Sequence, residues 1–153
     1  MDYLISDMLA LANEKYWQIS ALLELTLEQT DLLTGQNMQS LESNIDDKQA
    51  IIDRFDVLNA KFKELEELLL VEAGVHSLED LKENSKIEKM LELDFQMKQV
   101  LKTIVEVDAK NAAMAKQWLE FLGKKLASAS RAPVAFKEYQ QQMPGAIFVN
   151  RQG

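Results

Sequence analysis

Cysteine is absent from the 153-residue chain, and histidine occurs once, as His76. Without cysteine there are no disulfides or thiolate metal sites, which fits a reducing compartment. Structural zinc sites and di-iron bundles need histidine or cysteine ligands that the chain lacks. A glycine-rich phosphate loop is also missing. We therefore expect no metal, no cofactor and no enzymatic activity.

Glycine and proline are scarce, at five and two residues, so helices should be few and long. No apolar run reaches the length that a membrane span needs, and the N-terminal segment lacks the basic region and cleavage motif of a signal peptide. The net charge of −8 disfavours nucleic acid as a partner. We expect a cytoplasmic protein that neither inserts into a membrane nor binds nucleic acid.

Apolar side chains recur at helical spacing, with intervals of four and three, along most of the chain. This pattern predicts a helical hairpin over residues 3–71, a short helix over 77–83 and a long helix over 86–128. The expected fold class is all-α: an elongated antiparallel bundle of three long helices with short extra helices and an extended C-terminal tail. The expected division is a helical rod domain over residues 1–130 and a partner-binding tail over residues 131–153.

Small and polar residues mark the expected helix ends. Gly35 is placed to terminate the first helix as its C′ residue, and Asn37 can cap the second. Gly74 should end that second helix. Ser85 followed by Glu88 has the spacing of a capping box at the start of the long third helix.

Lys48 lies on the apolar stripe of the second helix, between Ile45 and Ile52, where a hydrophobic residue is expected. A lysine in a helix seam has a desolvation cost, so it needs an explanation. In an antiparallel hairpin, Lys48 comes within about one helical turn of Glu24 and Glu28. One hypothesis is that a bond to either glutamate fixes the register of the hairpin. The alternative is that Lys48 extends its ammonium to solvent from the edge of the seam.

Asn111 interrupts the apolar seam of the third helix, and a buried asparagine commonly trades stability for register. Large aromatic residues follow near the end of that helix, where such side chains often anchor a partner. The segment after residue 130 contains apolar clusters broken by proline and glycine, which is typical of a segment that docks on a partner. The predicted partner-binding residues are Trp118, Phe121, Leu122, Phe136, Tyr139, Ile147 and Phe148.

Two short motifs in the predicted hairpin indicate a family. Glu28 is followed by the pair Leu32–Leu33 and then by Gly35 in a short turn. On the second helix, Lys48 is followed by the pair Ile51–Ile52. In these features the chain resembles the FlgN family of flagellar export chaperones, in which the corresponding lysine is characteristic.

An asparagine that faces the seam of a later helix, here Asn111, extends the resemblance to about residues 5–130. The resemblance implies a cytoplasmic chaperone that binds the C-terminal region of the hook-associated (hook–filament junction) proteins. It would keep these subunits unassembled for type III export and deliver them to the flagellar export apparatus. Partner contacts in the family lie toward the C-terminal helix and tail. The alternatives are a homo-oligomeric coiled-coil scaffold and a chaperone of another secretion system.

Overall fold

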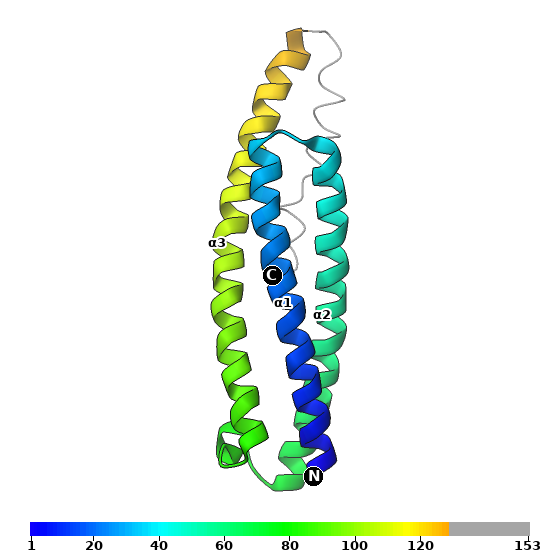
Figure 1. Cartoon of the computed structure of the whole chain (residues 1–153), viewed down its shortest axis with the longest axis vertical. Helices are drawn as coiled ribbons and strands as arrows, with labels where there is room; N and C mark the ends of the chain where they lie inside the picture. Colours follow the sequence, from blue (N-terminus) through cyan, green and yellow to red (C-terminus); the bar gives the residue numbers. More distant parts are fainter. Residues whose placement is uncertain (129–153) are drawn as a thin grey trace. The chain divides into compact units, whose positions relative to one another are not determined.

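The computed structural model describes residues 1–128, which contain three long helices, a short 3-10 helix and no strand. The long helices are α1 (Asp2–Thr34), α2 (Met38–Ala73) and α3 (Ser85–Ser128), and the 3-10 helix η1 is Leu78–Leu81 (Figure 1). The predicted all-α class with three long helices is confirmed. The expected tail lies outside the described residues.

The described residues divide into two compact units, and each long helix contributes a segment to both. Unit 1 is formed by Met1–Glu24 and Ala50–Thr103, which includes η1. Unit 2 is formed by Leu25–Gln49 and the described residues from Ile104 onward. In each unit the segments of α1 and α2 run antiparallel, as the short α1–α2 connection requires.

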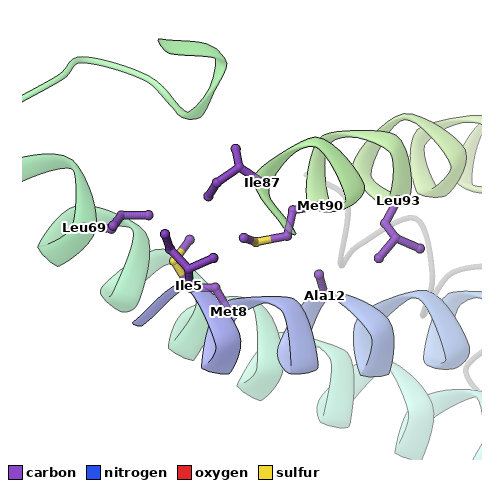
Figure 2. Packing of buried hydrophobic residues seen from close by; sticks show 7 residues of the cluster. All are labelled: Ile5, Met8, Ala12, Leu69, Ile87, Met90 and Leu93. Atoms are coloured by element: carbon purple, nitrogen blue, oxygen red, sulfur yellow. The ribbon is translucent and has the colours of Figure 1, made fainter. Parts of the chain in front are cut away.

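The interior of unit 1 is mostly apolar, with Lys15 as its buried charged residue. Figure 2 shows the buried cluster of this unit, in which side chains of α1 pack between those of α2 and α3. Partly buried leucine and aromatic residues surround them, so the helical spacing of apolar positions is used here as the sequence predicts. The buried cluster is Ile5, Met8, Ala12, Leu69, Ile87, Met90 and Leu93.

The apolar core of unit 2 is smaller. Its buried cluster contains only Leu33, Leu41 and Ala115, with Met114 and Trp118 among the partly buried side chains around it. Most of the other fully buried positions in this unit are polar. They are Thr26, Gln29, Asn44, Lys48, Asp108 and Asn111.

The connection between α1 and α2 corrects one expectation. Gln36, with φ of 53°, takes the left-handed position that was expected at Gly35. The Gln36 N–H donates to Leu33 O at 3.2 Å and the Asn37 N–H donates to Leu32 O at 3.0 Å, so the C′ residue is one position later than predicted. The cap of α2 is confirmed, since Asn37 Oδ1 accepts from the Ser40 N–H at 3.2 Å.

The ends of α2 and α3 are set by one glycine and one asparagine. Gly74, with φ of 68°, ends α2 as expected, and the Val75 N–H donates to Leu70 O at 3.1 Å. The cap of α3 is Asn84, because Asn84 Oδ1 accepts from the N–H groups of Lys86 and Ile87 at 2.9 and 3.3 Å. The expected capping box starting at Ser85 is therefore one residue out of place: Ser85 is the first residue of the helix.

Candidate functional site

Lys48 lies inside unit 2, where it joins all three helices. Its side chain is only 4% exposed, so its ammonium does not extend to solvent as the second hypothesis requires. The Lys48 Nζ donates to Asp108 Oδ1 of α3 at 2.8 Å and to Gln29 Oε1 of α1 at 3.1 Å. The residue that looks misplaced in the sequence is therefore the cation of a buried ion pair.

Asn111 continues this polar network on α3. Its Nδ2 donates to Thr26 O at 3.0 Å and to Gln29 Oε1 at 3.2 Å, and its Oδ1 accepts from Thr30 Oγ1 at 2.6 Å. Gln29 Oε1 thus accepts from both Lys48 and Asn111, which links the ion pair to the amide contacts. The polar seam consists of Thr26, Gln29, Thr30, Lys48, Asp108 and Asn111.

Burial dominates the electrostatics of Asp108. Desolvation raises the pKa of this carboxyl, while the hydrogen bond and the positive charge of Lys48 lower it and only partly compensate. Asp108 Oδ2 is buried and accepts no hydrogen bond from the described residues, so Lys48 is its main source of compensation. Because donors and acceptors meet in only one alignment, the polar seam can fix the register of α1, α2 and α3 in unit 2.

The other two residues of the register hypothesis lie elsewhere. Glu24 and Glu28 are both exposed on α1. The carboxylate that Lys48 contacts belongs to Asp108, which was not among the predicted site residues. One signal was present: counting four and then three residues from Ile104 leads through Asp108 to Asn111. Val107 fits the four–three spacing equally well, three residues after Ile104 and four before Asn111, so the spacing alone does not single out Asp108.

The predicted partner-binding residues of α3 lie at its C-terminal end, in unit 2. In Figure 1 the last turns of α3 continue past the α1–α2 connection. Trp118 packs against the small apolar cluster and Leu122 is half-buried, whereas Phe121 is 49% exposed. The Lys125 Nζ lies 4.8 Å from the centroid of the Phe121 ring. The remaining predicted residues, Phe136, Tyr139, Ile147 and Phe148, lie outside the described residues.

Residues 1–128 lack two further kinds of feature. They contain no group of three or more histidine, cysteine, aspartate or glutamate residues placed to hold a metal ion. Within the same range, none of the helices has the length together with the apolar character needed to cross a bilayer.

Comparison with known proteins identifies the family. The fold defines an all-α protein built from three long helices, and a family model described as FlgN protein matches residues 1–142. Because the match covers most of the chain, the chain belongs to the FlgN family. It is thus a member of a family of flagellar export chaperones. No curated protein and no solved structure matches the chain.

Proposed function

We propose that the chain binds the C-terminal region of hook-associated proteins in the cytoplasm and keeps them unassembled until it delivers them to the flagellar export apparatus. The family match over residues 1–142 carries this proposal. In this role the protein is a binding partner and catalyses no reaction. An amphipathic helix of the client would bury its apolar face against the chaperone, which is a common mode of helix recognition.

The C-terminal end of α3 is the proposed client-binding surface, continued by the tail over residues 131–153. Phe121 supports this assignment, because about half of a large aromatic side chain remains accessible next to the partly buried Trp118. Aromatic side chains supply much of the binding free energy of protein interfaces. Phe136, Tyr139, Ile147 and Phe148 would add apolar contacts from the tail.

Calorimetry can test the surface by titrating the chaperone with the C-terminal region of a hook-associated protein encoded in the same genome. Phe121→Ser should weaken binding at least tenfold, or about 1.4 kcal/mol. The matched control is Phe95→Ser, because Phe95 lies on the same helix in unit 1 and is more exposed, at 64%. Its affinity should stay within about twofold of wild type. Phe148→Ser tests the tail in the same assay.

The outcomes test the identity of the client and the location of its binding surface separately. If the wild-type chain binds no hook-associated C-terminal region, the proposed client is wrong. If Phe121→Ser and Phe95→Ser bind equally well, the client stands but the end of α3 is not its site. Circular dichroism of each variant checks that the helices are intact, and light scattering tests the alternative of a homo-oligomeric scaffold.

A further inference from the structure

Unit 1 contains a cavity that is separate from the proposed client surface. It has a volume of about 390 Å³ and lies between α1, α2, α3 and the connection that includes His76–Glu79. Its inner wall includes the buried residues Ala12, Lys15 and Met90, whereas the lining residues of the connection are mostly exposed. The cavity is thus deep on the helix side and open at the connection.

Lys15 is the unusual residue of this wall. It is only 6% exposed, and its ammonium makes no hydrogen bond or ion pair to the described residues. Instead the Lys15 Nζ lies 4.4 Å from the centroid of the Phe62 ring and 5.7 Å from that of Phe55. These cation–π contacts stabilise the charge, but they provide no oxygen or nitrogen acceptor for its three N–H donors. A ligand that brings an acceptor into the cavity would supply what the protein does not.

Burial has a measurable consequence for this amine. Desolvation lowers the pKa of Lys15, and the charges of Asp94 and Glu66 oppose this effect without cancelling it. The like charge of Lys63 lowers the pKa of Lys15 slightly further. The charged form of Lys15 is therefore only partly compensated in the described structure. A carboxylate placed beside it would favour the charged form, so the cavity is suited to an anionic group at its inner wall.

Acidic side chains provide the opposite charge in the same cavity. Asp94 is paired with Lys98 at 2.8 Å, but Glu66 and Glu79 form no ion pair with the described residues. Glu66 is half-buried, so it is placed to accept from a cation inside the cavity. Apolar walls are supplied by Phe62, Leu70 and Met90, together with Met97. Methionine side chains adapt readily to the shape of a bound apolar group.

We propose that this cavity binds an α-amino acid with a large apolar side chain. The ligand carboxylate accepts from the Lys15 ammonium, the ligand ammonium donates to Glu66, and the side chain packs between Phe62 and the methionines. Ligand pockets range over about 300–1,000 Å³, so a cavity near the lower limit suits a ligand of this size better than a helix of a partner protein. The cavity belongs to unit 1 and the proposed client surface to unit 2, so this proposal goes beyond the proposed function.

Ligand analogues test each contact in the wild-type protein. The titration is followed by the methyl resonances of the methionines, and L-leucine, L-methionine and L-phenylalanine are the probes. At least one should bind saturably below about 10 mM. L-leucinamide removes the carboxylate and N-acetyl-L-leucine removes the ammonium, so each should bind at least tenfold more weakly than L-leucine. Glycine, which lacks the apolar side chain, should not bind in this range.

The test is completed by Lys15→Met and a matched control, Lys61→Met. Lys61 is an exposed residue of α2 that does not line the cavity. In Lys15→Met the preference for L-leucine over L-leucinamide should disappear, whereas Lys61→Met should retain it. The proposal is overturned if no probe binds saturably in wild type, or if leucine and its two analogues bind equally well. If Lys15→Met does not fold, the analogue series in wild type still decides.

Discussion

Replacing Lys48 by methionine tests the polar seam directly, because methionine preserves the length of the side chain and removes its charge. The substitution leaves Asp108 buried, with the 2.8 Å bond to its Oδ1 lost and with Oδ2 already lacking a donor among the described residues. Removing one partner of a buried ion pair costs about 3–5 kcal/mol, because the other charge is left uncompensated. Lys48→Met should therefore lower the free energy of unfolding by about that amount near neutral pH.

The loss should depend on pH, and the direction follows from Asp108. Burial already raises the pKa of this carboxyl, and removing Lys48 removes the two effects that lower it, so the pKa rises further in the variant. A carboxyl with a raised pKa in the folded state favours folding below its unfolded pKa, and this contribution is lost as pH rises through the folded pKa. Relative to wild type, the variant should thus be least stable near neutral pH and recover as the pH falls.

Urea unfolding followed by circular dichroism measures both effects. The matched control is Arg54→Met, which breaks the exposed pair between Arg54 and Glu14, whose side chains are 48% and 41% exposed. Exposed pairs contribute about 1 kcal/mol or less, so this control should cost little at any pH. Adding Asp108→Leu to Lys48→Met should restore much of the lost stability, with a coupling energy above about 2 kcal/mol.

Three results would refute the reasoning about the pair. The first is a loss in Lys48→Met no larger than that in Arg54→Met. The second is a loss that does not change between neutral and mildly acidic pH. The third is a double variant whose loss of unfolding free energy equals the sum of the losses in Lys48→Met alone and Asp108→Leu alone. Such additivity would mean that Lys48 and Asp108 do not interact.

Three further substitutions test local features by thermal unfolding. Gln36→Gly should raise the free energy of unfolding by about 1 kcal/mol, because a non-glycine residue in the left-handed region is strained. Gly74 has a similar φ, so Gly74→Ala should introduce the same strain and lower the melting temperature. Asn111→Leu should cost about 1–3 kcal/mol, because Thr30 and Gln29 lose a hydrogen-bond partner in a buried site; a raised melting temperature would instead support a purely register-setting role.

The helices could be predicted from sequence because their signals are local. The four–three spacing of apolar residues and the rarity of glycine and proline locate α1, α2 and α3, and Asn37 and Gly74 mark two of their ends correctly. The errors are one-residue shifts between adjacent candidates. At the α1–α2 turn, Gln36 rather than Gly35 is left-handed, and at α3 the cap is Asn84 rather than Ser85. Asn84 and Ser85 are both residues that commonly cap helices, whereas Gln36 is left-handed although Gly35 would tolerate that conformation better; in both cases the backbone path decides.

The polar seam could be predicted only in part, because its partners depend on tertiary packing. Lys48 and Asn111 stand out against apolar neighbours in their own helices, so both were found as interior polar residues. Asp108 and Gln29 look like ordinary solvated residues until α1 and α3 are placed beside α2. Within the hairpin, helical spacing opposite Lys48 indicates Glu24 and Glu28, whereas the carboxylate that completes the pair lies 60 residues after Lys48 in the sequence.

The two units use different chemistry in their interiors, and the difference bears on the proposed client surface. Apolar burial in unit 1 is non-directional, so it stabilises packing without selecting one register strongly. In unit 2, donors and acceptors on three helices must coincide, and a shift of one residue would leave buried groups unpaired. The seam through Asp108 and Asn111 thereby holds the part of α3 that continues to Trp118 and Phe121.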